Sequence, residues 1–156
     1  YEEAINRDPD FEWAYQQLAS VYKDLDNYEA AESYAKKAIS INPKLYLSYL
    51  TLGDCALSKE DYSAATQYFG EAQKILIRLN DDYHTPLYVN VENQLGFAYE
   101  LLDNPAEAIQ HYQSAVNVAK ENISSSSQDD EYAEDLDYAQ TSLKRVQSRP
   151  ASKKLP

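Results

Sequence analysis

The feature that most limits what this chain can fold into is a pattern of apolar and small residues that returns after 34 positions. The first copy contains Tyr15, Leu18, Ala19 and Tyr22, followed by Tyr28, Ala31, Ala35 and Ala38. The second contains Tyr49, Leu52, Gly53 and Ala56, followed by Tyr62, Ala65, Phe69 and Ala72. Spacings of three and four residues place each set on one face of a helix. Each copy is therefore predicted to be a helical hairpin.

A third copy arrives 43 residues after the second, so the chain carries an insertion between them. Its residues are Leu95, Gly96 and Tyr99, followed by Ala108, Tyr112 and Ala115. Ile77 stands where the helix-ending Pro43 would recur. Because proline is missing there, we expect the second helix of the second hairpin to continue through KILIRLN before a loop at DDYHTP.

The turns and helix crossings are specified by small and polar residues. Ala19, Gly53 and Gly96 lie where the two helices of a hairpin must approach closely, and a larger side chain would separate them. The residues expected to cap the second helices are Asn27, Asp61 and Asn104, and Pro105 takes a first helical position. In the third copy Glu92 replaces the tyrosine of the other two, which predicts different packing or an exposed face there.

The segments YQQLASVY, YLTLGDCA and ENQLGFAY, with the partners YEAAESYAKKA, YSAATQYFGEA and PAEAIQHYQSA, resemble the tetratricopeptide repeat. The resemblance covers residues 1 to about 122. It implies an all-α, right-handed superhelical solenoid of antiparallel helix pairs with a C-terminal capping helix. The capping helix is expected to bury one stripe, made of Tyr132, Leu136, Ala139, Leu143 and Val146.

The expected organisation follows from the repeat boundaries. The opening YEEAINRDPD matches YAKKAISINP, so residues 1–11 are expected to be the second-helix tail of a truncated repeat in a longer array. Repeats are then expected over 12–45, over 46–88 with the extended helix and insertion, and over 89–126. A linker and capping helix over 127–148 and a disordered tail over 149–156 complete the chain.

Charge and composition narrow the class of partner. The net charge is −12, but basic residues are concentrated after position 143, and the residues before it sum to −17. Such an acidic body should repel nucleic acid and anionic lipid, so a protein partner, basic or neutral, is expected. No apolar run approaches the roughly 20 residues needed to span a bilayer, so we expect no direct membrane insertion. The single cysteine fits a reducing compartment, and we expect a cytoplasmic protein.

No catalytic constellation is recognisable in the sequence. His84 and His111 have no metal-ligand spacing, Cys55 occupies a small packing position, and no glycine-rich phosphate loop is present. Asn122 opens a glycosylation sequon, Asn-Ile-Ser, which is weak evidence on its own. We therefore expect no enzymatic activity, no cofactor and no metal.

The candidate binding residues form a stripe along the first helices of the three hairpins. They are Trp13, Gln16, Ser20 and Lys23, then Leu47, Leu50, Asp54 and Leu57, then Asn90, Asn93, Phe97 and Glu100. The resemblance implies that this first-helix stripe lines a concave groove that holds a peptide or helix of a partner protein. Side-chain amides suit a peptide backbone, and the large apolar residues offer pockets. Only Lys23 is basic in the positions where related chaperone-tail receptors place Lys, Asn and Arg, so that use is not expected.

Other readings of the stripe remain open. The leucines could pack against a neighbouring helix, such as the C-terminal one. The domain could be a structural element that self-associates, or the regulatory part of a larger enzyme. An acidic, histone-chaperone-like binder is the least favoured reading, since it rests on charge and on DDEYAEDLD alone.

Overall fold

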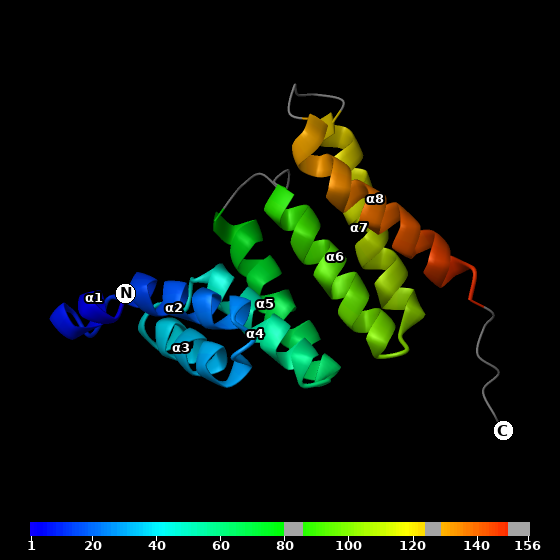
Figure 1. Cartoon of the computed structure of the whole chain (residues 1–156). Coiled ribbons are helices and arrows are strands. Elements are labelled where there is room, and N and C mark those ends of the chain that lie inside the picture. Colours follow the sequence, from blue (N-terminus) through cyan, green and yellow to red (C-terminus); the bar gives the residue numbers. More distant parts are fainter. Residues whose placement is uncertain (80–85, 124–128, 150–156) are drawn as a thin grey trace. The chain divides into compact units, whose positions relative to one another are not determined.

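A computed structural model of the chain describes residues 1–79, 86–123 and 129–149, and every regular element in these ranges is a helix (Figure 1). The helices are α1 (Glu2–Arg7), α2 (Glu12–Asp24), α3 (Tyr28–Ile41), α4 (Tyr46–Ser58), α5 (Tyr62–Leu79), α6 (Pro86–Leu101), α7 (Pro105–Ile123) and α8 (Asp129–Gln147). The chain divides into two compact units, Tyr1–Asp81 with α1 to α5 and Asp82–Pro156 with α6 to α8. The expected tail is outside the described residues from position 150 onward.

The first unit consists of two hairpins, α2 with α3 and α4 with α5, and α4 packs on both helices of the hairpin before it. Ala19, Ala35 and Leu52 form a buried cluster at this junction, with Tyr34 and Tyr68 against it. Small residues on α2 and α3 let the helices approach, and larger residues from the next hairpin fill the remaining space. The predicted helical hairpins are thus confirmed.

The turns inside the three hairpins have the same backbone conformation. Asp26, Glu60 and Asp103 have φ values of 56°, 59° and 54°, and each follows the last turn of a first helix. Asn27 and Asp61 then cap the second helices, accepting backbone N–H bonds at 3.2 and 3.0 Å. The cap expected from Asn104 is wrong, because its side chain makes no hydrogen bond to any described residue, and α7 instead begins with the donor-free Pro105.

The close helix crossings are confirmed at both glycines. A Cβ on Gly53 would lie 2.3 Å from Cε1 of Phe69, and one on Gly96 would lie 2.7 Å from the ring of Tyr112. Real Cβ atoms do not approach a carbon so closely, so both positions require glycine while the facing ring is aromatic. By contrast, a Cβ on Gly70 would meet no atom within 4 Å.

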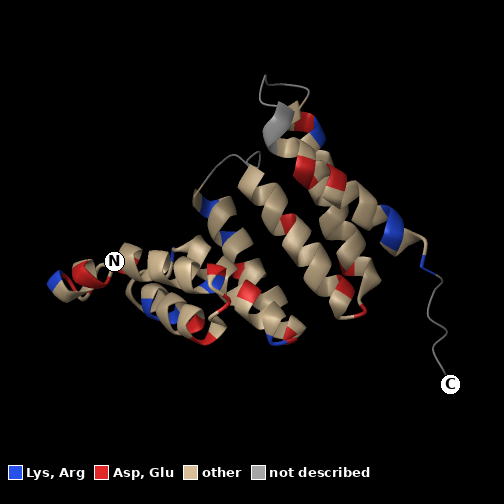
Figure 2. Cartoon of the chain, in the orientation of Figure 1, with Lys and Arg blue, Asp and Glu red and all other residues tan. Residues whose placement is uncertain are grey.

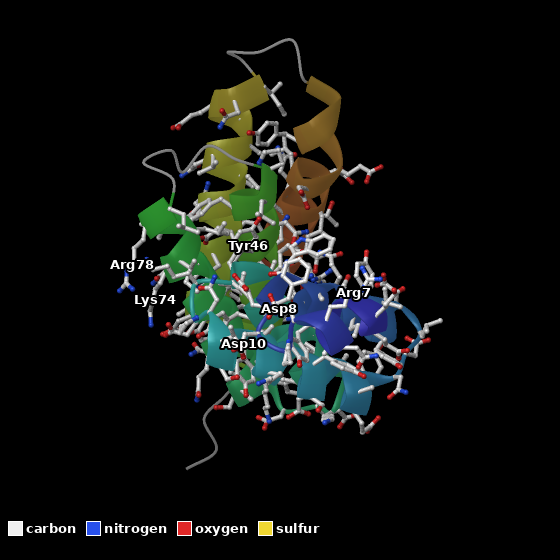
Figure 3. All side chains as sticks on the ribbon, turned by 90° about the vertical axis from the view of Figure 1, so that its left-hand side faces the viewer. Arg7, Asp8, Asp10, Tyr46, Lys74 and Arg78 are labelled. Atoms are coloured by element: carbon white, nitrogen blue, oxygen red, sulfur yellow. The ribbon has the colours of Figure 1, made fainter. Side chains whose placement is uncertain are left out.

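Most of the inserted residues lengthen α5 and α6. α5 has 18 residues against 14 in α3, and α6 has 16 residues against 13 in α4. The predicted extension of α5 is confirmed as far as Leu79, with Ile75 and Leu76 buried on its inner side. Figure 3 shows the outer side of the same turns, where Lys74 and Arg78 extend away from the helix.

The loop expected at DDYHTP lies outside the described residues, except for its last residue. Pro86 is the first residue of α6, a position that suits proline because the first backbone N–H of a helix has no helical partner. α6 therefore begins before the repeat boundary expected at residue 89.

In the second unit α8 packs along α7 and also contacts α6 (Figure 1). Tyr132 and Ala139 are buried with Val89, Ala115 and Ala119, and Leu136 packs against this cluster. Val146 is buried near Tyr112, with Leu143 beside it. The predicted apolar stripe of this helix is confirmed, and its buried face covers the hairpin made by α6 and α7. Figure 2 shows Lys and Arg gathered at the end of α8, where the last turn contains Lys144 and Arg145.

Candidate partner-binding surface

The first-helix stripe is distributed over both units. Its residues on α2 and α4 lie together in the first unit, and its residues on α6 lie in the second. The first set, Trp13, Gln16, Ser20, Lys23, Leu47, Leu50, Asp54 and Leu57, is called here the α2/α4 stripe. The second set, Asn90, Asn93, Phe97 and Glu100, is called the α6 row.

Trp13, the only tryptophan of the chain, begins the α2/α4 stripe and is 47% exposed. Two aromatic side chains contact its ring. Tyr1 meets its ring edge-on with centroids 5.5 Å apart, and Phe11 lies at 5.9 Å. Contacts of this kind restrict a side chain while leaving its face open. Trp13 is therefore an accessible apolar surface with two aromatic contacts.

Gln16 lies one helical turn beyond Trp13 and is only 7% exposed. Its amide makes no hydrogen bond to any described residue. The amide is also not among the buried polar atoms that are sealed from solvent. Water can therefore reach the amide, and a ligand could take the place of that water. Gln16 thus presents a donor and an acceptor, with most of its side chain already desolvated.

The α4 part of the stripe is mainly apolar. Leu47 is 38% exposed, and Leu50 and Leu57 are half-buried. None of these leucines is among the buried core residues in the described part of the chain. They lie on α4, which packs against α2, the helix that carries Gln16.

The far end of the α2/α4 stripe is polar. Lys23 on α2 donates to Asp54 on α4 at 3.2 Å and approaches Asp24 at 3.8 Å. Burial raises the pKa of the Asp54 carboxyl, and the lysine opposes that rise without cancelling it. These residues line a recess of about 550 Å³, called here the acidic recess, whose walls are Lys23, Asp24, Asp26, Tyr28, Asp54, Leu57 and Ser58.

The α6 row is engaged by α8. Asn93 is 3% exposed, and its Nδ2 donates to the backbone oxygen and to the carboxylate of Asp135 at 3.0 and 3.3 Å. Burial raises the pKa of Asp135, whereas hydrogen bonds from Asn93 and Asn90 lower it. The Oδ1 atom of Asn93 is buried and has no partner. Asn90 and Phe97 are half-buried.

Glu100 closes the α6 row and is paired with two arginines. Arg145 donates to both of its carboxylate oxygens at 3.0 and 2.8 Å, Arg149 donates at 2.6 Å, and Tyr112 donates at 3.1 Å. Burial alone would raise the pKa of Glu100, but the two arginines and the tyrosine outweigh it and hold that pKa below its usual value. A partner could use Asn93 or Glu100 only by replacing contacts that α8 already makes.

The remaining reactive side chains serve packing. Glu92 is 1% exposed, and its carboxylate lies 2.9 Å from Nδ1 of His111, whose ring stacks on Tyr99 at 5.3 Å. His111 thus packs between Glu92 and Tyr99, and the altered packing expected at Glu92 is explained by its histidine partner. Burial raises the pKa of the Cys55 thiol to about 11, which keeps this buried cysteine protonated and unreactive. His84 and the sequon's Ser124 are outside the described residues.

Across the described ranges no three His, Cys, Asp or Glu side chains gather as metal ligands. No described helix combines the length and apolar character that crossing a bilayer requires.

Comparison with known proteins identifies the family. Tetratricopeptide repeat profiles match residues 45–121 and residues 14–45. Together with the helical hairpins this shows that the chain belongs to the tetratricopeptide repeat family, with an all-α repeat fold of the solenoid class. Proteins of this family are generally interaction modules rather than catalysts, and this chain is a protein-interaction scaffold in that general sense.

Among curated proteins the chain is similar to Protein SGT1 homolog. It is 35% identical to the Bos taurus protein over 72 residues, which are 46% of this chain and 21% of that protein. The same identity and length apply to the Homo sapiens protein, of which 20% is covered. The chain therefore spans about a fifth of the length of these relatives.

Solved structures support the fold at low sequence identity. The N-terminal domain of stress-induced protein-1 (STI-1) from C. elegans is 16% identical with a TM-score of 0.62, over 83% of this chain and 94% of that one. MamA is 16% identical with a TM-score of 0.64, over 96% and 88%. YrrB, described as a TPR protein with an unusual peptide-binding site, is 16% identical with a TM-score of 0.64, over 90% and 73%.

Proposed function

We propose that this chain is a non-catalytic scaffold that binds an extended peptide segment of a partner protein along the α2/α4 stripe. The observation that carries the proposal is Gln16, a residue that is 7% exposed and whose amide makes no hydrogen bond to any described residue. An extended backbone offers one N–H and one C=O per residue, which are the two groups that a glutamine amide can pair with. Because its polar atoms still reach solvent, the amide is open to a ligand that pairs with it.

The flanking residues support the same assignment. Trp13 and Leu47 are both more than a third exposed, and they lie on α2 and α4, which pack against each other. Large apolar side chains of this type dominate the affinity of protein interfaces, and rigid ones lose little entropy on binding. The α6 row is a weaker candidate because α8 already occupies the polar groups of Asn93 and Glu100.

The test is a selection of binders from a phage-displayed library of random dodecapeptides, followed by fluorescence anisotropy with the selected peptides. Trp13→Ala and Leu50→Ala should each weaken binding by about tenfold or more, since losing a hot-spot side chain costs about 2 kcal/mol. Leu79→Ala is the matched control, because Leu79 is 53% exposed on the same unit outside the stripe. Gln16→Leu, which keeps the shape but removes the amide, should also weaken binding.

Two results would contradict this function. The selection could enrich no peptide that binds the whole chain, or the selected peptides could bind the Trp13 and Leu50 variants as tightly as the wild type. Circular dichroism of each variant would establish that any loss of binding is not a loss of helix.

Two alternatives are separated by simple measurements. Self-association through exposed aromatic residues such as Tyr1 and Phe11 would make the mass in sedimentation depend on concentration. A regulatory role within a larger enzyme would be tested on the full-length protein. The region matched in the SGT1 relatives is about a fifth of their length. The cytoplasmic location expected from the single cysteine stays a prediction.

A further inference from the structure

The acidic recess adds a charge requirement to the α2/α4 stripe. Three carboxylates, from Asp24, Asp26 and Asp54, face a single ammonium group, that of Lys23. That ammonium group is already paired with Asp54 at 3.2 Å. Asp26 accepts a hydrogen bond from the hydroxyl of Tyr28 at 3.0 Å, which adds no positive charge. The recess therefore keeps a net negative charge that its own side chains do not neutralise.

The recess continues the same helix face as Gln16. Lys23 follows Gln16 by seven residues, which is about two turns and about 10 Å along α2. Leu57 belongs both to the apolar part of the stripe and to the wall of the recess. A ligand lying on the stripe would thus pass from the unpartnered amide and the leucines directly to the carboxylates.

An extended chain advances about 3.3 Å per residue, so about three residues cover the distance from Gln16 to Lys23. A side chain that reaches the recess must also place its charge beyond the aliphatic wall at Leu57. Lysine and arginine have an aliphatic stem and a cationic end, which match that order of surfaces.

We propose that the α2/α4 stripe selects segments in which a lysine or arginine lies about three residues from a large apolar residue. The apolar side chain rests on Leu47 and Leu50 near Gln16, and the cation enters the acidic recess. This inference rests on the proposed function, since it assigns the chemistry of the segment that the same stripe binds. It is a requirement on the partner and is independent of the identity of the protein that carries the segment.

The test uses the same dodecapeptide library on the whole chain and on a variant with Asp24→Asn and Asp26→Asn. Both residues are exposed and lie at or beyond the end of α2, and asparagine tolerates the positive φ of Asp26. Asp8→Asn with Asp10→Asn is the matched control, because it removes the same two charges from exposed positions outside the recess. Peptides selected on the wild type should share an apolar residue and a lysine or arginine at the stated spacing.

The strongest selected peptide is then titrated in three forms, with the basic residue kept, changed to glutamine, or changed to glutamate. The basic form should bind the wild type at least tenfold more tightly than the glutamine form, and the glutamate form should bind most weakly. In the Asp24→Asn, Asp26→Asn variant the difference between the forms should fall by at least threefold, whereas the Asp8→Asn, Asp10→Asn variant should retain it.

The outcomes separate this inference from the function on which it rests. If peptides bind through Trp13 and Leu50 but the three forms bind equally, the recess does not select a cation and the inference is overturned while the scaffold function stands. If the charge preference survives the double substitution, the cation binds elsewhere and the inference is also overturned. If no peptide is enriched, both proposals are refuted.

Discussion

Gly53→Ala tests the close crossing of α4 and α5 with the smallest possible change. The new Cβ would lie 2.3 Å from Cε1 of Phe69 and 2.6 Å from both Cδ1 and Cζ. Carbon atoms in contact are ordinarily about 3.5–4.0 Å apart, so the ring or the helix must move by more than about 1 Å. Phe69 is fully buried, which leaves its ring little space to move into.

Two opposing effects set the magnitude. Overpacking a buried site typically costs about 1–3 kcal/mol, and this overlap places the site toward the upper part of that range. Replacing glycine by alanine within a helix recovers about 1 kcal/mol. The expected net result is a loss of about 1–2 kcal/mol in the free energy of unfolding, and Gly53→Leu should cost more.

The assay is urea unfolding followed by circular dichroism, with two reference variants. Gly70→Ala is the matched control, because a Cβ there meets no atom within 4 Å, so only the helix-propensity gain of about 1 kcal/mol should appear. Phe69→Leu removes the ring atoms that cause the overlap while keeping an apolar side chain. In that background Gly53→Ala should become neutral or stabilising.

A double-mutant cycle decides the matter. The coupling between Gly53→Ala and Phe69→Leu should be about 1–3 kcal/mol, as expected for residues in direct contact. Additive effects, or a Gly53→Ala variant as stable as Gly70→Ala, would show that the glycine does not permit the crossing and would refute the packing argument.

Further predictions concern single sites that the repeat pattern leaves imperfect. Ser48→Ala should raise the free energy of unfolding by about 1–2 kcal/mol in urea melts, because its Oγ is buried without a partner and the matching residue of the first hairpin is already Ala14. Glu60→Gly should stabilise by about 1 kcal/mol, because Glu60 has a φ of 59°. The Glu100→Gln variant should lose less stability than the wild type when the solution is acidified. Folding lowers the pKa of Glu100, so its carboxylate stabilises the folded state above the unfolded pKa, and this contribution is lost as pH falls through the folded pKa. The measurement is the free energy of unfolding at several pH values between 6 and 3. A parallel loss of stability in wild type and variant would contradict the prediction.

The fold was predictable because the repeat expresses local and nearest-neighbour constraints. The positions of Gly53 and Gly96 indicate a close crossing even before the facing ring is known, and Asn27 and Asp61 indicate where second helices begin. The missing cap at Asn104 shows the limit of such local rules, since a proline at the next position already supplies a helix start.

The candidate site was less predictable because solvent access depends on contacts between distant segments. The stripe assigns equivalent roles to Gln16 and Asn93, yet Asp135 on α8 takes the amide of Asn93 while the amide of Gln16 stays without a partner. Spacing places residues on a face but does not state which face another helix covers. A signal did exist in Arg145, a basic residue in an acidic chain, which pairs with the buried Glu100.

Glu92 shows that this repeat constrains pairs of residues rather than single positions. In the first hairpin Tyr15 lies 6.4 Å from Tyr34, centroid to centroid, and in the third hairpin the same two positions hold Glu92 and His111. Each alone would be a poor substitution, since a buried carboxylate needs a hydrogen-bonding partner. Together they form a 2.9 Å contact, and His111 stacks on Tyr99 as Tyr34 stacks on Tyr22 in the first hairpin. The helices can therefore retain their arrangement while the chemistry between them changes, provided that both partners change.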